Sequence, residues 1–135
     1  MDIISLKSQF SKYKKDLLDL NKYMYENPEL GYQEIKSVNK ITKLIKKHTA
    51  DAKFKKFTDI PTAFTASINN KPRRENIAIC IEYDALPNVG HACGHNLISS
   101  IGLGAFFILS NYIKDIDYEI KLVGCPAEEI IPLTY

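Results

Sequence analysis

Residues 77–96 read Ile77-Ala78-Ile79-Cys80-Ile81-Glu82-Tyr83-Asp84-Ala85-Leu86-Pro87-Asn88-Val89-Gly90-His91-Ala92-Cys93-Gly94-His95-Asn96. The first five residues are all apolar, and this unbroken run predicts that residues 77–83 form a central strand buried on both faces, as in a parallel or mixed sheet covered by helices. The potential metal ligands that follow are Glu82, Asp84, His91, Cys93 and His95. A buried strand that ends in such a cluster indicates a functional site at its carboxyl end.

The cluster favours a metal ion because thiolate, imidazole and carboxylate are the protein ligands of a divalent ion such as zinc. His91, Cys93 and His95 are spaced two residues apart, so an extended segment would place them on one side and at least two of them could face one point. Each residue alone also has an ordinary structural interpretation, since histidines are common in loops and a single cysteine often serves as a small buried apolar residue. The combination favours the metal site.

Two helices are predicted ahead of this stretch. Apolar residues at steps of three and four predict a first helix, which Asn27-Pro28 ends, and a second helix has lysines opposite its apolar face. The first apolar face consists of Phe10, Tyr13, Leu17, Leu20 and Met24, and the second of Ile35, Val38, Ile41, Ile45 and His48. We expect His48 to be an exposed helix-end residue with no role.

Strands are predicted at residues 52–57 and 63–68, and residues 69–72 read as a turn. After His95, small and large apolar residues predict a closely packed buried helix over residues 97–113. Alternation at Tyr118, Ile120 and Leu122 then predicts another strand. Residues 115–117 read as the turn between this helix and this strand.

The last predicted strand ends in a second cluster, Gly124-Cys125-Pro126-Ala127-Glu128-Glu129. Alternating helices and strands predict an α/β fold with a mixed, largely parallel sheet flanked by helices, and such folds bind ligands outside the carboxyl ends of their strands. The two clusters are therefore expected to meet. Alone, Glu128 and Glu129 read as a solvated turn, but beside a metal one carboxylate can bind the ion while the other moves protons.

Length and composition favour a single globular domain, with 135 residues, 45% hydrophobic and 25% charged. Residues 1–75 hold 16 Lys and Arg against 9 Asp and Glu, but these lysines lie on solvated helix faces, so we expect no nucleic-acid partner. The apolar run at residues 101–109 is too short to span a bilayer, and no secretory signal is recognised at the start. Three cysteines without a CxxC motif favour a reducing cytoplasm over a disulfide framework.

Four ordered motifs resemble the M20 family of metallopeptidases and amidohydrolases, and within it the aminoacylase, aminobenzoyl-glutamate hydrolase and dipeptidase branch. They are Asn27-Pro28-Glu29-Leu30-Gly31, Tyr83-Asp84-Ala85-Leu86-Pro87, Gly90-His91-Ala92-Cys93-Gly94-His95-Asn96 and Pro126-Ala127-Glu128-Glu129. The resemblance implies that residues 1–135 are the N-terminal portion of the catalytic domain, without the inserted dimerisation domain and the C-terminal part. Members of the family take further histidine ligands from those missing portions.

The resemblance also implies roles for individual residues. Cys93, His95 and Glu129 would bind metal, Glu128 would be the general base, and Asp84 would orient the metal site. His91 would line the site without binding metal. Asn96 stands where many relatives have Asp, which leaves its contact with the metal open.

The function implied is metal-dependent hydrolysis of the amide bond of N-acyl amino acids or dipeptide-like small molecules. The complete enzyme would hold two divalent ions, zinc or manganese with cobalt possible, and would form a homodimer. Two alternatives stay open. One is a non-catalytic metal-binding or partner-binding module derived from such an enzyme. The other is a redox or thiol-sensing protein built on Cys80, Cys93 and Cys125.

Overall fold

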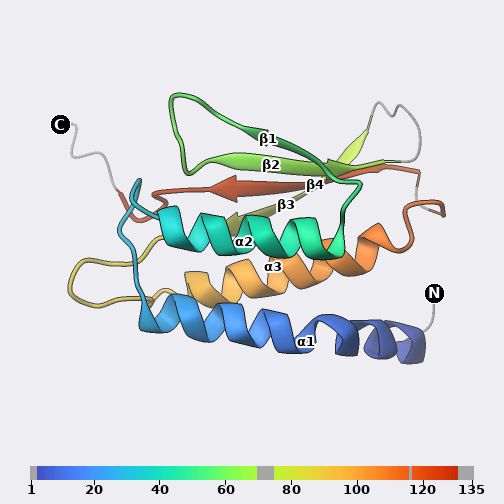
Figure 1. The fold of residues 1–135 in the computed structure, drawn as a ribbon, viewed down its shortest axis with the longest axis horizontal. Helices are drawn as coiled ribbons and strands as arrows, with labels where there is room; N and C mark the ends of the chain where they lie inside the picture. Colours follow the sequence, from blue (N-terminus) through green and yellow to red (C-terminus); the bar gives the residue numbers. More distant parts are fainter. Residues whose placement is uncertain (1–2, 70–74, 116, 131–135) are drawn as a thin grey trace.

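A computed structural model describes residues 3–69, 75–115 and 117–130, and the predicted turn at residues 69–72 and residue 116 lie largely outside this part. The chain forms a helical layer on a sheet (Figure 1). The helices are α1 (Ile3–Glu26), α2 (Ile35–His48) and α3 (His95–Ser110), and the strands are β1 (Lys53–Lys56), β2 (Phe64–Ile68), β3 (Asn76–Glu82) and β4 (Glu119–Cys125). The predicted helices and strands are confirmed, each with slightly different bounds.

The described strands form one sheet in the order β1-β2-β4-β3. The α/β fold with a mixed sheet and flanking helices is confirmed, but the expectation of a largely parallel sheet is wrong for this part of the chain. β1 pairs with β2 and β2 with β4 antiparallel, whereas β3 and β4 are parallel. A parallel pair needs a crossover of a dozen or more residues. α3 supplies one between β3 and β4, while the short connection from β1 to β2 allows only an antiparallel turn.

The strand β3 lies at an edge of the described sheet, and the expectation of a central strand buried on both faces is wrong here. Ile81 is fully buried, but Ile77 is 41% exposed, and Ala78 and Cys80 are also exposed. In Figure 1 the three helices lie together on one side of the sheet, so only alternate residues of β3 are covered. An apolar run indicates that a strand is suited to burial, but it does not show what covers it.

The core lies between the helices and this covered face of the sheet. α3 packs on β3 and β4, and α1 packs along α3. The predicted apolar faces of α1 and α2 are buried except at their first members, Phe10 and Ile35, which are 41% and 50% exposed. Buried members of the core from α1, α2, β2, β4 and α3 include Leu17, Met24, Ile41, Phe64, Leu122 and Phe106.

Two glycines allow close approach inside this core. A Cβ atom at Gly102 of α3 would collide with the side chain of Ile81 on β3, and one at Gly124 of β4 would collide with the ring of Phe64 on β2. Gly102 thus brings α3 close to the strand that precedes the first ligand cluster. Gly124 makes room for a large aromatic residue under the strand that precedes the second.

The expectation that His48 is exposed and without a role is wrong. Its side chain is only 13% exposed, and its Nε2 lies 2.7 Å from Oδ2 of Asp16 on α1. The imidazole ring also packs against Tyr13 and Phe107, with centroid distances of 5.0 Å to each. Lys47 lies 2.6 Å from the same carboxylate oxygen. The end of α2 is therefore joined to α1 by charge and by ring packing.

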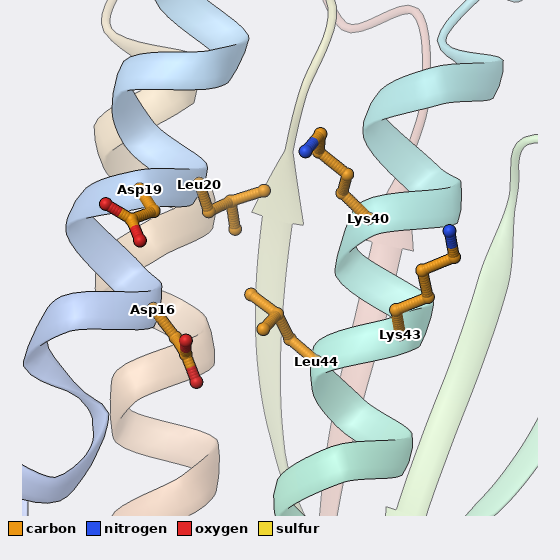
Figure 2. A pocket seen from close by; sticks show the side chains of 6 residues that line it. All are labelled: Asp16, Asp19, Leu20, Lys40, Lys43 and Leu44. Atoms are coloured by element: carbon orange, nitrogen blue, oxygen red, sulfur yellow. The ribbon is translucent and has the colours of Figure 1, made fainter.

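A pocket lies between α1 and α2 beside this junction (Figure 2). Leu20 and Leu44 point toward each other across it, with acidic residues on α1 and basic residues on α2. The charged lining residues are Asp16, Asp19, Lys40 and Lys43. This pocket carries no cluster of metal ligands. Across the described residues, the helices are too short or too polar for one to cross a membrane.

Candidate metal centre

His95, the first residue of α3, is held in one orientation by Asp84 just beyond β3. Its Nδ1 lies 2.9 Å from the Asp84 carboxylate and 3.1 Å from the Asp84 carbonyl oxygen. Both neighbours can only accept hydrogen bonds, so Nδ1 carries the proton and donates it. A carboxylate behind a histidine in this way fixes the tautomer and raises the basicity of the opposite nitrogen. Nε2 of His95 is thereby prepared to bind a cation.

Three carboxylates surround Nε2 of this histidine. Glu82 lies 3.2 Å away, and Glu128 and Glu129 each lie 3.6 Å away. One ligand atom each of Glu82, His95 and Glu128 falls within 4.8 Å of the others. Such a concentration of negative charge around one imidazole nitrogen is costly unless a cation lies between the groups. The donor set fits a divalent ion.

Cys93, on the loop before α3, lies beside Glu129 and is not among the three residues whose ligand atoms gather within 4.8 Å of one another. Its thiol is exposed, and a hydrogen bond to Glu129, followed by desolvation and the nearby carboxylates, raises the pKa of Cys93 above its ordinary value. A divalent cation would oppose this effect, because it stabilises the thiolate that binds it. Cys93 and Glu129, which are far apart in the sequence, therefore lie together in the folded chain.

Hydrogen bonds to two buried acids position the loop that carries Glu128 and Glu129. The backbone N–H of Glu129 donates to Oδ2 of Asp84 at 2.9 Å, while Ala127 donates to Oε1 of Glu34 at 2.8 Å. Ala127 has a φ of 59°, an uncommon conformation for alanine that these contacts help to maintain. Asp84 thus orients both His95 and Glu129, as a residue that positions the ligands would.

The motif from Asn27 to Gly31 contacts the segments that carry the candidate ligands. The Glu29 carboxylate accepts hydrogen bonds from the backbone N–H groups of Lys36 and Ser37 at the start of α2. The carbonyl oxygen of Glu29 accepts the N–H of Ala85. A Cβ atom at Gly31 would collide with Ala127 and Ile130. This motif contacts both loops of the metal centre, which explains its residue types in structural terms.

The predicted extended segment from His91 to His95 is instead a turn that leads into α3. His91, Cys93 and His95 therefore do not lie on one side of an extended strand. His91 is 7% exposed, both its ring nitrogens lack a hydrogen-bond partner, and burial followed by the charge of His95 lowers its pKa. Asn96 donates to Asn21 of α1, so its amide group is directed away from the carboxylates.

Sequence reasoning did not assign a role to Glu82, which lies nearest to Nε2 of His95. The signal was present, because Glu82 is two residues before Asp84 at the end of the strand and is the first acidic residue of the cluster. Residues spaced by two point to the same side of a strand. Glu82 was a candidate ligand by residue type, but its distance to His95 is a property of the fold.

Comparisons with known proteins find relatives in sequence and in fold. Xaa-Arg dipeptidase of Mus musculus is 33% identical over 121 residues, which are 82% of this chain and 28% of the relative. N-acetyl-L-cysteine deacetylase of Bacillus subtilis is 27% identical over 95% of this chain and 35% of its own length. A dinuclear metal-binding peptidase from the M20 family of Bacillus subtilis superposes with a TM-score of 0.77 at 24% identity, over 92% of this chain and 37% of that one.

The chain is similar in sequence to this dipeptidase and has the fold of this M20 family peptidase. A putative aminohydrolase from methicillin-resistant Staphylococcus aureus has the same fold, with a TM-score of 0.79 and 23% identity over 94% of this chain and 36% of that structure. No family model matches the sequence. The chain thus spans about a third of the length of the relatives that it matches.

Proposed function

We propose that this chain contributes metal ligands and the general base to an amide hydrolase that acts on N-acyl amino acids or dipeptide-like substrates. The observation that supports the proposal most directly is His95, whose Nδ1 is held by Asp84 while its Nε2 faces the carboxylates from the ends of two parallel strands. The substrate class follows from the names of the relatives, a dipeptidase and an N-acyl deacetylase.

In this proposal Cys93, His95 and Glu129 bind a divalent ion, and Glu82 is an additional candidate ligand beside the same ring nitrogen, Nε2 of His95. Three protein ligands with an open position suffice for a catalytic zinc site, and the same donors accept manganese or cobalt. The ion, when bound, would polarise the amide carbonyl and lower the pKa of a water molecule. A neighbour described as dinuclear supports a second ion in the complete enzyme.

Glu128 is the proposed general base. Its side chain is 54% exposed, in contrast to Glu129, which is 18% exposed. The more exposed carboxylate can reach both solvent and a bound substrate, whereas the less exposed one is held by its backbone contact with Asp84. Glu128 would take a proton from the attacking water and deliver it to the leaving amine. Asp84 takes no part in proton transfer and acts by positioning His95 and Glu129.

The proposal also covers the wider organisation of the protein. We place residues 1–135 in the N-terminal portion of the catalytic domain, with an inserted dimerisation domain and a C-terminal part in the complete enzyme. Homodimer formation and a cytoplasmic location belong to the same proposal. The free state of Cys80, Cys93 and Cys125 agrees with a reducing compartment.

The test compares Glu128→Gln with Glu129→Gln in the longest available form of the enzyme. Glu128→Gln is expected to abolish hydrolysis of an N-acyl amino acid while zinc content, measured by mass spectrometry, stays unchanged. Glu129→Gln is expected to lower both hydrolysis and zinc content. A matched control is Glu26→Gln on the exposed end of α1. Loss of zinc with Glu128→Gln would show that the two glutamates have been assigned the wrong roles.

The non-catalytic alternative makes a different prediction for the same preparation. A derived metal-binding module would bind zinc through Cys93 and His95 but would show no hydrolysis with zinc, manganese or cobalt. The thiol-sensing alternative predicts that alkylation of Cys93 persists after zinc is added. Protection of Cys93 by zinc would contradict it.

A further inference from the structure

A second pocket, here called the His91 pocket, lies beside the proposed metal centre. It has a volume of about 450 Å³ and is lined by Tyr25, Pro28, Leu30, Leu86, Val89 and His91, together with Asn88 and Gly90 of the same loop. Tyr25 comes from the end of α1, Pro28 and Leu30 from the loop after it, and the others from the loop between β3 and α3.

Backbone hydrogen bonds connect the walls of the His91 pocket to the ligand-bearing segments. Ala85, which follows Asp84, donates its N–H to the carbonyl of Glu29 at 2.9 Å, and Gly94, which precedes His95, donates its N–H to the carbonyl of His91 at 3.2 Å. The pocket and the metal centre are therefore built on the same two loops. A molecule in the pocket lies next to the segment that carries Cys93 and His95.

The lining of the pocket selects for an uncharged group. Its lining combines leucine, proline, valine and tyrosine side chains with a comparable area of polar atoms, and none of the described lining residues is an aspartate, glutamate, lysine or arginine. Ligand pockets of this kind combine an apolar surface with a few polar groups that fix orientation. A charged group would lose its hydration in this pocket without gaining a partner of opposite charge.

His91 supplies the polar group that such a pocket needs. Its side chain is 7% exposed, and neither ring nitrogen has a hydrogen-bond partner among the described residues. Most buried polar groups in proteins are hydrogen-bonded, and exceptions call for a functional or solvent explanation. A bound molecule with a carbonyl or amide group would give the imidazole a partner once the ring turns toward the cavity.

We propose that the His91 pocket binds the uncharged acyl group of the amide substrate, with His91 as its hydrogen-bonding residue. This inference rests on the proposed function for the identity of the occupant. The volume accommodates an aromatic or branched acyl group. The pocket therefore favours such substrates over those whose acyl part carries a charge.

The test uses three probes of nearly equal shape, namely neutral benzamide, anionic benzoate and cationic benzamidine. Each is titrated into the ¹⁵N-labelled chain in the presence of a chelator, so that the outcome does not depend on metal binding. Benzamide is expected to shift the amide resonances of Leu86, Val89 and His91 and to bind several-fold more tightly than either charged probe. Equal or tighter binding of benzamidine, or shifts confined to other segments, would overturn the proposal.

Val89→Asp tests the lining directly, because Val89 is 63% exposed and is changed without disturbing the core. This variant is expected to weaken benzamide binding about fivefold and to strengthen benzamidine binding. Ile101→Asp, at a 69% exposed position on α3, is the matched control and should change neither. Unchanged benzamide binding in Val89→Asp would contradict the proposal.

Proximity to the metal centre is measured separately with Mn²⁺ in place of the chelator. Bound Mn²⁺ is expected to broaden the ring-proton resonances of benzamide in the wild type and not in His95→Ala. Mn²⁺ binding without broadening would place the pocket too far away for an acyl group and overturn the proposal. Failure of Mn²⁺ to bind would contradict the proposed function instead, while the chelated titration still decides whether the pocket takes uncharged ligands.

Discussion

Asp84 has two contacts at the residue scale that the rest of the site depends on. One carboxylate oxygen accepts from His95 and the other from the backbone N–H of Glu129. The side chain is completely buried, so its charge is compensated by these donors rather than by water. Asp84 therefore fixes the orientation of one proposed ligand and the position of another.

Replacing Asp84 by Asn should weaken metal binding without removing a ligand. The amide NH₂ cannot accept a hydrogen bond, so either His95 or the Glu129 N–H loses its acceptor. We expect zinc affinity to fall about 10-fold to 100-fold, the usual effect of removing such a partner. Isothermal titration measures the change, and Asp59→Asn in an exposed loop is the control. Unaltered affinity would show that Asp84 does not position the ligands.

The thiol of Cys93 gives a second prediction, on pH dependence. Because the raised pKa of Cys93 is caused first by Glu129, less thiolate is present at a given pH and alkylation by iodoacetamide is slowed. In chelator, Glu129→Gln should lower this pKa and shift the alkylation profile of Cys93 to lower pH. Peptide mass spectrometry measures it. Cys125, whose pKa is raised to about 11 mainly by burial, is an internal reference that should stay slow in both proteins.

At the scale of elements, the junction between α1 and α2 depends on Asp16. Lys47 and then His48 lower the pKa of Asp16 through hydrogen bonds. Because the folded-state pKa is below the ordinary value, this contribution to stability is complete above pH 3.8 and is lost as the pH falls through the lowered pKa. α2 carries Glu34 at its start and so connects this junction to the loop of the metal centre.

Asp16→Asn is expected to reduce the free energy of unfolding by about 1 kcal/mol at pH 7, since the anion pairs with the exposed Lys47 and with the mostly buried His48. The difference from the wild type should disappear as the pH falls through the lowered pKa. Urea unfolding at several pH values tests this. Asp19→Asn is the control, because Asp19 pairs with Lys15 where the side chains are 62% and 87% exposed. Equal effects of the two variants would contradict the proposed importance of the junction.

The packing of β4 on β2 gives another prediction at this scale. Gly124→Ala should destabilise the chain by about 1–3 kcal/mol, because its methyl group would overlap the Phe64 ring. Phe64→Leu in the same chain should recover part of this loss by making room for the methyl group. Thermal unfolding of the single and double variants measures the coupling. Additive losses would show that the two side chains do not compete for space.

At the scale of the whole molecule, the metal centre joins three parts of the fold. Glu82 ends β3, His95 begins α3, and Glu128 follows β4. A cation that binds only the folded chain stabilises it in proportion to the logarithm of its concentration over Kd. The effect is large here because the negative charges repel one another without the ion.

Zinc at 100 times its Kd should therefore raise the free energy of unfolding by about 2.7 kcal/mol. For a chain of this size that corresponds to a rise in Tm of about 10 °C. Differential scanning calorimetry with zinc and with a chelator measures the shift. His95→Ala should abolish most of it, and Ile101→Asp should leave it unchanged. A zinc-dependent shift that survives in His95→Ala would place the bound ion elsewhere.

The sequence alone predicts the helices, the strands and the residue types of the candidate metal centre. Apolar periodicity predicts both leading helices, because a helix buries one face at steps of three and four residues. The dense group of ligand types after residue 81, and the paired glutamates at 128 and 129, predict a metal site, because few other sites combine thiol, imidazole and carboxylate. These are properties of residue type and spacing, which need no long-range contact.

Only the tertiary structure decided how these pieces are arranged. The direction of each strand pairing, the edge position of β3 and the burial of His48 depend on which surfaces meet, and local patterns do not contain that information. The same holds for Glu82, whose 3.2 Å approach to His95 arises because the loop after β3 returns to begin α3 beside it. Strand direction and side-chain convergence are set by contacts between distant residues, and so the geometry of the metal centre is a property of the folded chain.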